Sequence, residues 1–220
     1  MPSSLTPSLV LSAYARGIFP MSESREDQEI FWVDPTLRGI IPLDGFHISR
    51  SLRKSLLRSS YDIRIDTAFM DVVSACADRD ETWINDEIFE IYENLFSSGH
   101  AHSLEVWRDD KMIGGVYGIC LRGAFFGESM FSTAKDGSKI ALAYLVHRLN
   151  SAGFTLFDTQ FLTPHLASLG GVEISRAAYK ARLKAALEVE ANFLQPPLQV
   201  SADLVCSQSP KRRSADDPAP

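Results

Sequence analysis

The chain has 220 residues, of which 45% are hydrophobic and 23% charged, and a formal net charge of −6, as expected for a soluble globular protein of one or two domains. No stretch is long and apolar enough to cross a membrane, and the absence of a P-loop and of GxGxxG argues against nucleotide hydrolysis and dinucleotide redox chemistry. The three cysteines are an odd number without metal-ligand spacing, which fits a reducing compartment, and the five histidines form no metal-binding pair. We therefore expect a cytoplasmic protein with no metal, no cofactor and no membrane contact.

The N-terminal part of the chain predicts a small domain followed by a basic helix. Residues 1–35 have the pattern of a helix-and-turn segment, and a helix should begin after Ser49 as N-cap, with Ile48, Leu52 and Leu56 on one face. The opposite face carries only positive charges, namely Arg50, Arg53, Lys54 and Arg58. This face is either an ordinary solvated helix surface or a site for an anion such as a phosphate backbone, and the uniform sign favours the anion.

Two regions of opposite charge suggest two differently charged ligands. Residues 38–64 carry six basic side chains, the first of them Arg38, against two acidic ones. Residues 78–93 carry seven acidic side chains against Arg79 alone. Local patches of this kind govern binding more than the net charge does.

The C-terminal part of the chain predicts a mixed α+β domain. Its alternating and apolar runs predict strands at 102–107, 112–121, 124–131 and 154–161, and helices at 138–150 and 174–190. The order of several antiparallel strands, a helix, a strand and a helix is typical of an acyltransferase domain, which we place at 36–206. We expect residues 207–220 to be a disordered tail because they are polar and rich in proline.

Asp158 and Gln160 end the apolar run FTLF and are a candidate catalytic pair. Side chains alternate along a strand, so both should point to one face, about 7 Å apart at the backbone. There a carboxylate and an amide can share a hydrogen bond and orient an incoming amine. The pair could equally serve to satisfy polar groups of a loop.

Glu128 is a second candidate because it lies among apolar and aromatic residues, where an unpaired carboxylate is costly. Its partner could be an internal cation, or it could receive a positively charged group of a substrate. The glycines of Gly114–Gly118 in the preceding strand indicate a bulge or a close approach of the backbone to a ligand.

Ten segments in order from about residue 12 to 180 resemble the leucyl/phenylalanyl-tRNA–protein transferase family. They are AYARGIFPM, FHISRS, CADRDETWI, GHAHSLEVW, MIGGVYGI, FFGESMFS, SK.AL, GF.L.DTQF, HLASLGGVEISR and Tyr179. The resemblance implies an N-acetyltransferase-like (GNAT) domain behind a small N-terminal domain. It also implies transfer of leucine or phenylalanine, with methionine as a third candidate, from aminoacyl-tRNA to proteins beginning with Arg or Lys, which marks them for N-end-rule degradation.

The resemblance also implies roles for individual residues. Asp158 and Gln160 would be the catalytic pair. The pocket for the transferred side chain would be formed by Val116, Phe125, Leu142, Leu145, Leu149 and Phe157, although the helical spacing of the three leucines also suits simple core packing. The tRNA 3′ end and the acceptor would meet Tyr14, Trp83, Tyr92 and Glu128, and the tRNA backbone would meet Arg50, Arg53, Lys54 and Arg58.

The chain departs from the family pattern in three places. Met21 follows GIFP where relatives often carry tryptophan, the N-terminal segment is shorter than in many relatives, and Val116 stands where a larger methionine is common. The last difference bears on the choice between leucine and phenylalanine, since one or two methylenes change selectivity by about 1–3 kcal/mol.

The reaction implied is aminolysis of an activated ester, which needs neither ATP nor a metal. We expect the side-chain oxygen of Gln160 to accept a hydrogen bond from the attacking amine, while Asp158 orients Gln160. Two alternatives remain: an acetyl-CoA-dependent N-acetyltransferase of the same fold, which usually carries a pyrophosphate-binding loop not found here, and a non-catalytic tRNA-binding protein.

Overall fold

A computed structural model of the chain describes residues 5–27, 29–58 and 60–208. The helices are α1 (Pro7–Tyr14), α2 (Arg50–Arg58), α3 (Phe69–Ala77), α4 (Asp86–Ser97), α5 (Gly137–Ser151), α6 (Pro164–Ser168), α7 (Arg176–Leu187) and α8 (Ala202–Ser207). The strands are β1 (Phe19–Met21), β2 (Phe31–Val33), β3 (Leu37–Ile40), β4 (Asp62–Ile65), β5 (Ala101–Arg108), β6 (Lys111–Leu121), β7 (Ala124–Ser132), β8 (Leu156–Gln160) and β9 (Val172–Ser175).

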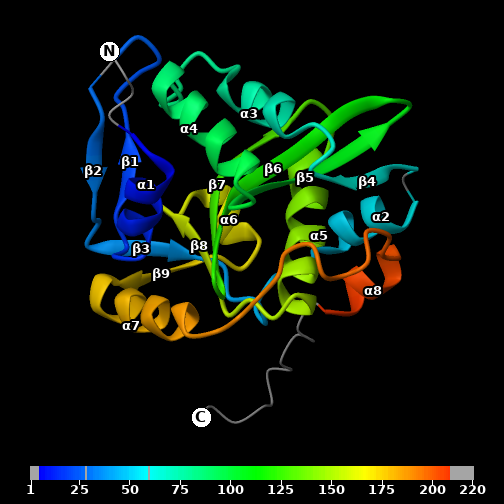
Figure 1. The fold of residues 1–220 in the computed structure, drawn as a ribbon. Coiled ribbons are helices and arrows are strands. Elements are labelled where there is room, and N and C mark those ends of the chain that lie inside the picture. Colours follow the sequence, from blue (N-terminus) through cyan, green and yellow to red (C-terminus); the bar gives the residue numbers. More distant parts are fainter. Residues whose placement is uncertain (1–4, 28, 59, 209–220) are drawn as a thin grey trace.

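A mixed seven-stranded sheet forms the centre of the molecule, in the order β4-β5-β6-β7-β8-β3-β9 (Figure 1). Its neighbouring strands are antiparallel except β7 and β8, which are parallel and are joined through α5. A crossover helix is the usual connection for a parallel pair. Strands β1 and β2 form a separate two-stranded ribbon.

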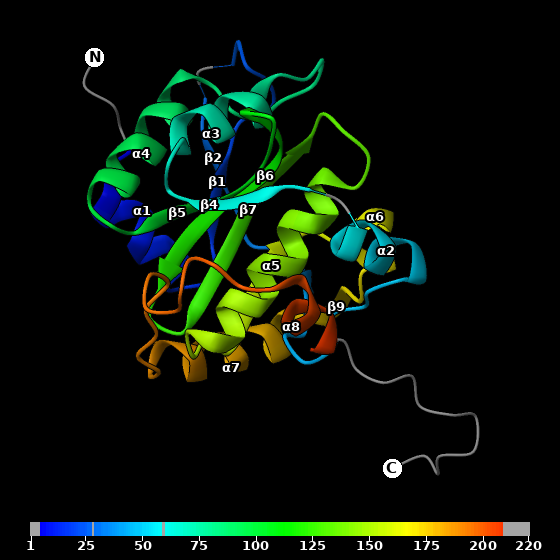
Figure 2. The same cartoon turned by 90° about the vertical axis from the view of Figure 1, so that its right-hand side faces the viewer.

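Helices cover both faces of the sheet (Figure 2). Each face has its own apolar core. The core on one face includes residues of α2, α5 and α8, whereas the core on the other includes residues of α1, α3, α4 and α7. Alternation along β6 illustrates the division, because Val116 belongs to the first core and Tyr117 to the second.

The glycines of β6 permit close contact with neighbouring backbone. A Cβ atom on Gly114 would lie 2.5 Å from the carbonyl carbon of Gly137, at the start of α5. A Cβ atom on Gly118 would lie 2.2 Å from the oxygen of Phe126, and the register of β6 and β7 shifts between Tyr117 and Gly118. The expected bulge is therefore confirmed, whereas the group that closely approaches both glycines is the chain itself and not a ligand.

The sequence patterns predicted the C-terminal elements more accurately than the N-terminal ones. The mixed α+β class is confirmed, as are the strands at 102–107, 112–121, 124–131 and 154–161 and both helices, with ends shifted by a few residues. The helix-and-turn prediction for residues 1–35 missed the β1–β2 ribbon. Of the expected tail, Ser207 ends α8, and residues 209–220 lie outside the described residues.

The expected boundary between residues 35 and 36 falls between β2 and β3 and stays a prediction. Across the described parts of the chain, no helix is both long enough and apolar enough to cross a membrane.

Candidate active site

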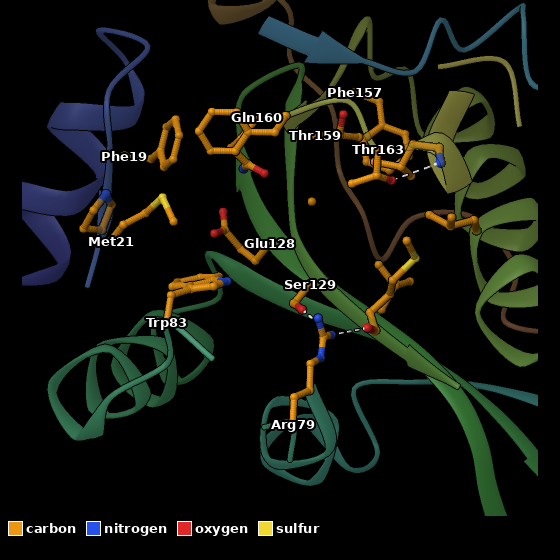
Figure 3. Close-up of a pocket in the computed structure, with 17 residues that line it drawn as sticks. Phe19, Met21, Arg79, Trp83, Glu128, Ser129, Phe157, Thr159, Gln160 and Thr163 are labelled. Carbon is orange, nitrogen blue, oxygen red and sulfur yellow. Dashed lines mark hydrogen bonds between the residues drawn. The ribbon is translucent and has the colours of Figure 1, made fainter. Parts of the chain in front are cut away.

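A cavity of about 270 Å³ opens where β7 and β8 separate. The parallel pairing of these strands ends at Phe126 and Asp158, yet both strands continue. Residues 127–130 of β7 and residues 159–160 of β8 then line the cavity. Figure 3 shows Gln160 and Glu128 in the middle, Phe157 and Thr163 on one side, and Phe19, Met21 and Trp83 on the other.

One side of the cavity is apolar. Five of the elements around it each contribute one apolar side chain, namely Val116, Met130, Leu142, Phe157 and Leu166. Leu166 is held near Thr163, whose hydroxyl accepts a hydrogen bond from the Leu166 amide at 3.2 Å and caps α6. This wall can receive one apolar side chain of moderate size, and Arg79, which also lines the cavity, is hydrogen-bonded to the Met130 carbonyl.

The structure does not bring all the expected pocket residues to the cavity. Val116, Leu142 and Phe157 line it, but Phe125, Leu145 and Leu149 lie in the buried core behind. Leu145 and Leu149 are about one and two turns farther along α5 than Leu142, which moves them about 4.5 Å and 10 Å along the helix axis. Phe125 instead packs against Phe154, Phe157 and Phe193.

Asp158 is fully buried, and its carboxylate accepts four hydrogen bonds. Its Oδ1 accepts from Arg38 Nε at 2.9 Å and from the backbone amide of Gln160 at 2.8 Å. Its Oδ2 accepts from Arg38 Nη2 and from the Tyr179 hydroxyl, both at 2.6 Å. All its strong acceptor positions are thus occupied by the protein, so Asp158 has no free lone pair for a substrate.

Arg38 is the cation that makes this buried carboxylate tolerable. Its side chain is 1% exposed, lies over the rings of Phe19 and Tyr179, and also donates to the Gly17 carbonyl at 3.1 Å. Burial alone would lower the pKa of Arg38, but its hydrogen bonds to Asp158 and the charge of Asp158 raise it. Counting Arg38 in a basic surface was therefore wrong, because its charge is neutralised inside the fold.

Gln160 has a backbone conformation that the strand pattern did not predict. Its φ of 55° lies in the left-handed region, so simple alternation with Asp158 fails at this residue. Gly39 lies opposite on β3, where a Cβ atom would come within 2.7 Å of the Phe161 backbone, so glycine leaves room for the turn. The expected hydrogen bond between the two side chains is replaced by one from the Gln160 backbone amide, because Arg38 and Tyr179 occupy the rest of the carboxylate.

The surroundings of Gln160 orient its side-chain amide. Its NH₂ group is assigned to the side of the carbonyl oxygens of Gly127, at 2.8 Å, and Thr159, at 3.1 Å, because the opposite orientation would set the amide oxygen against these two acceptors. The amide oxygen is then turned away from these two carbonyl oxygens, which have no hydrogen to donate to it. Gln160 thus contributes a held hydrogen-bond acceptor to the lining of the cavity.

Glu128 lines the cavity, and two buried tyrosines hold its carboxylate. Tyr14 donates to Oε1 at 2.8 Å and Tyr92 donates to Oε2 at 2.6 Å. Burial raises the pKa of Glu128 to about 7, although both hydrogen bonds lower it. Within the described residues no ion pair involves Glu128, so the internal salt bridge considered from the sequence is not formed.

The four residues expected at the substrate end are therefore grouped in space but differ in access. Glu128 and Trp83 line the cavity, while Tyr14 and Tyr92 are buried behind them. The ring of Tyr92 packs edge-on against Trp83, with centroids 6.4 Å apart. Tyr14 and Tyr92 thus affect the cavity only through the side chains that they contact, which are Glu128 for both and Trp83 for Tyr92.

Sequence reasoning missed two arginines of the site. Arg79 lines the cavity and donates to the Ser129 hydroxyl at 2.9 Å, and it is the single basic residue of the acidic stretch 78–93. Arg38 lies directly before Gly39 and two isoleucines. A charge in such an apolar run needs a buried partner, and that signal could have identified it.

The basic helix α2 lies apart from the cavity lining. Ser49 accepts the Leu52 amide at 3.2 Å as the expected N-cap, and Leu52 and Leu56 are buried. The opposite face is exposed to solvent and carries Arg50, Arg53, Lys54 and Arg58. Four exposed cations on two and a half turns suit a polyanion.

These features define an enzyme of mixed α+β fold with a site suited to acyl transfer. The cavity has an apolar wall that can take an apolar side chain and, beside it, the held side-chain amide of Gln160. Among the residues described, no group of three or more His, Cys, Asp or Glu could hold a metal ion.

Comparison with known proteins gives the family. The family model for leucyl/phenylalanyl-tRNA protein transferase matches residues 40–184, and the model for the N-terminal domain of the same family matches residues 3–36. The chain therefore belongs to the leucyl/phenylalanyl-tRNA–protein transferase family, and it is an aminoacyltransferase.

Similar curated proteins carry the same name. One from Ruegeria sp. (strain TM1040) is 63% identical over 194 residues, which cover 88% of this chain and 92% of that protein. One from Roseobacter denitrificans is 60% identical over 201 residues, covering 91% and 96%. Among solved structures, a functionally unknown conserved protein from Staphylococcus epidermidis aligns with a TM-score of 0.40 and 11% identity over 79% of this chain and 66% of that one, too low to carry an argument.

Replacing Arg38 by methionine should destabilise the fold by about 3–5 kcal/mol, because it leaves the Asp158 carboxylate buried without a cation. Arg38→Lys keeps the charge but not the paired hydrogen bonds, so its loss should be smaller. The measurement is the free energy of unfolding in urea. Arg64, which is partly exposed beside Asp62 and Asp110, provides the matched control Arg64→Met, which should cost less than about 1 kcal/mol. Equal effects at the two arginines would contradict the assignment.

The raised pKa of Glu128 predicts a pH-dependent stability. In the folded chain the carboxyl of Glu128 keeps its proton up to about pH 7, whereas a glutamate of the unfolded chain releases it at about pH 4.3. The stabilisation by the protonated carboxyl is therefore complete at low pH and is lost as the pH rises through about 7. The free energy of unfolding of the wild type relative to Glu128→Gln should fall from about pH 5 to about pH 8. Exposed Glu90→Gln should follow the wild-type curve, and a constant difference for Glu128→Gln would disprove the shift.

Proposed function

We propose that this chain transfers leucine, phenylalanine or methionine from aminoacyl-tRNA to the N-terminal α-amine of proteins that begin with Arg or Lys, which marks them for N-end-rule degradation in the cytoplasm. The observation that carries the proposal is the single cavity wall of apolar side chains that ends at the held amide of Gln160. Family membership supplies the donor class, and the cavity supports an apolar aminoacyl group.

The apolar wall receives the side chain of the transferred amino acid. Val116, Leu142 and Phe157 surround it without a charged group, which disfavours charged aminoacyl residues. Met130 and Leu166 complete the wall, and flexible methionine can adapt to side chains of different shape. This arrangement suits leucine, phenylalanine and methionine better than small or polar residues.

The reaction is aminolysis of the ester that links the amino acid to the terminal ribose. The nitrogen of the acceptor amine attacks the carbonyl carbon, the carbon–oxygen bond to the ribose breaks, and the proton lost by nitrogen ends on the ribose hydroxyl. An α-amine has a pKa of about 7.7–8.0, so a sufficient fraction is neutral and positioning matters more than a strong base. The side-chain oxygen of Gln160 accepts a hydrogen bond from the attacking amine and directs its lone pair toward the carbonyl.

Asp158 acts through Gln160 and does not contact the substrate. Its four hydrogen bonds leave it no acceptor for the amine, and one of them holds the Gln160 backbone in its left-handed conformation. Its negative charge, though paired with Arg38, also lies on the side of the site where positive charge develops on nitrogen. Asp158 is therefore a positioning residue, and Gln160 is the catalytic one.

Glu128 receives the positively charged first residue of the acceptor. It lines the cavity, its two oxygens are oriented by Tyr14 and Tyr92, and no cation of the described chain pairs with it. A carboxylate with a pKa near 7 is ionised more fully once a cation binds beside it. Trp83 belongs to the acidic stretch 78–93, whose excess of negative charge favours the same sign of ligand.

The exposed cations of α2 bind the backbone of the tRNA, and Trp83 lies where the 3′ end enters. We propose a small N-terminal domain at 1–35 and a GNAT-like transferase domain at 36–206. The separate family-model matches at 3–36 and 40–184 support that division, and the order of strands and helices supports the domain type.

Transfer of labelled leucine and phenylalanine from charged tRNA to peptides that differ only in their first residue tests the function. We expect product with Arg and Lys starts, little with Asp, Glu or Ala, and none with acetyl-CoA as donor. Glu128→Gln should reduce kcat/KM for the Arg and Lys peptides about tenfold, as expected for a lost charged partner. The matched control is Glu90→Gln on exposed α4, which should change nothing.

Other outcomes of this assay would replace the proposal in defined ways. Transfer to acidic starts would retain the chemistry and overturn the acceptor assignment. Acetyl transfer alone would indicate an acetyl-CoA-dependent enzyme, and tRNA binding without any transfer would indicate a non-catalytic protein.

Gln160→Ala should lower kcat by about 100-fold or more, since it removes the acceptor for the amine, while KM for the donor changes little. Asp158→Asn should lower kcat too, because it weakens the pairing with Arg38 that holds the Gln160 backbone. Single-turnover rates with Leu-tRNA and an Arg-starting peptide measure both effects. Gln195→Ala, an exposed glutamine of the C-terminal segment, serves as control. Near-normal turnover of Gln160→Ala would refute the assignment.

A further inference from the structure

The phenylalanine that lines the apolar side of the cavity is supported by a second ring. Phe157 packs edge-on against Phe125, with ring centroids 5.5 Å apart. Phe125 is buried and belongs to the core behind the cavity. A displacement of the Phe125 ring would therefore move the part of the cavity wall that Phe157 forms.

Two glycines bring both rings into direct contact with the backbone of the sheet. A Cβ atom on Gly118 of β6 would lie 2.6 Å from Cζ of Phe125, and one on Gly127 of β7 would lie 2.8 Å from Cε2 of Phe157. The backbone of a central strand cannot move without disturbing its neighbours. The other side chains around Phe125 therefore decide where its ring can shift.

One of these side chains comes from the segment after α7. Phe193 stacks on Phe125, with centroids 5.7 Å apart and ring planes 15° apart, and also on His102, at 4.7 Å and 14°. Phe193 is buried and lies beyond residue 184, where the match to the family model ends. A residue outside the matched region thus packs against the support of the cavity wall.

A buried arginine of α5 fixes the segment at this point. The guanidinium of Arg148 donates to the carbonyl oxygens of Phe193 at 2.6 Å, Pro197 at 2.8 Å and Pro196 at 3.3 Å. It also lies over the Phe193 ring, 5.5 Å from the centroid. Hydrogen bonds from a charged donor are about twice as strong as neutral ones, so the backbone at Phe193 is held firmly. Leu142 of the cavity wall lies on the same helix, which joins the wall to its support.

We propose that Phe193 is a positioning residue that limits the depth of the acyl pocket and so sets the choice between leucine and phenylalanine. The inference rests on the proposed function and adds to it a residue that does not contact the substrate. A smaller side chain at this position leaves a void into which Phe125 can shift, because a core relaxes partly around a cavity. Phe157 then follows, and the deeper pocket favours phenylalanine, which is the larger of the two donor side chains.

The test measures donor selectivity as the ratio of kcat/KM for Phe-tRNA to kcat/KM for Leu-tRNA, with one Arg-starting peptide as acceptor. Effects on the acceptor site and on the fraction of folded enzyme cancel in this ratio. Phe193→Leu should raise the ratio about fivefold, less than the factor of about 10–200 that one methylene in direct contact can give. Phe193→Met, which fills more of the space but lacks a rigid flat face, should shift it in the same direction with a smaller loss of stability.

A double-mutant cycle shows whether the effect passes through Phe125. Phe125→Leu should also raise the ratio, and its combination with Phe193→Leu should raise it by less than the product of the two single effects, because both variants act on one contact. A merely structural role would not produce this coupling in a selectivity ratio. Phe69→Leu is the matched control, since Phe69 is buried in the core on the other face of the sheet and stacks on Phe96 at 4.4 Å. It should lose stability as well but keep the wild-type ratio.

Several results would overturn the inference. An unchanged or lowered ratio in both variants of Phe193 would show that this ring does not limit the pocket. An equal shift in Phe69→Leu would mean that any loosening of the core alters the ratio, and independent effects at Phe193 and Phe125 would exclude the proposed route. Failure of the wild type to transfer either amino acid would instead refute the proposed function, so the two failures are distinguishable.

Discussion

The buried ion pair between Arg38 and Asp158 is the interaction on which the site depends. Such a pair gives little net stability, because both charges lose their hydration on burial. Its main effect is to fix the positions of the groups around it. Through Arg38 the carboxylate is tied to Gly17 and Phe19 of the N-terminal segment, and its Oδ2 also accepts a hydrogen bond from Tyr179 of α7. Three parts of the chain that are distant in sequence are thus fastened around the last residues of β8.

In the proposed reaction, these contacts leave Asp158 to position the site and Gln160 to meet the amine. A carboxylate with a free oxygen could act as a base, but a fully bonded one can only fix the groups around it. Asp158 holds the backbone of Gln160 where Gly39 leaves room for the turn, and the amide is then oriented by the carbonyl of Gly127. The cavity lies between diverging strands, so the same divergence that creates space for the acyl group also exposes Gln160 to it.

Local patterns predicted those parts of the fold in which they extend over many residues. The strands from 102 to 131 and helix α5 are long enough for periodicity to show, whereas the three-residue strands β1 and β2 are too short. The ten ordered motifs predicted the family, yet they did not predict that Asp158 pairs with Arg38, because the partners are 120 residues apart. Helical spacing likewise grouped Leu142 with Leu145 and Leu149, but spacing along a helix cannot say at which turn a cavity ends.

In the proposed reaction, the different chemistry of the two ends of the cavity separates donor from acceptor. Around Phe157 the wall is apolar, so a cationic side chain would lose its hydration there without compensation. Beside Trp83, Glu128 offers a carboxylate whose two oxygens are already held by Tyr14 and Tyr92, so a cation gains a partner without having to order it. Because burial raises the pKa of that carboxylate to about 7, part of it is uncharged near neutral pH, and a cation bound beside it would favour the ionised form. In the proposed function, an acceptor beginning with an uncharged residue would therefore give up the interaction that favours the ionised carboxylate.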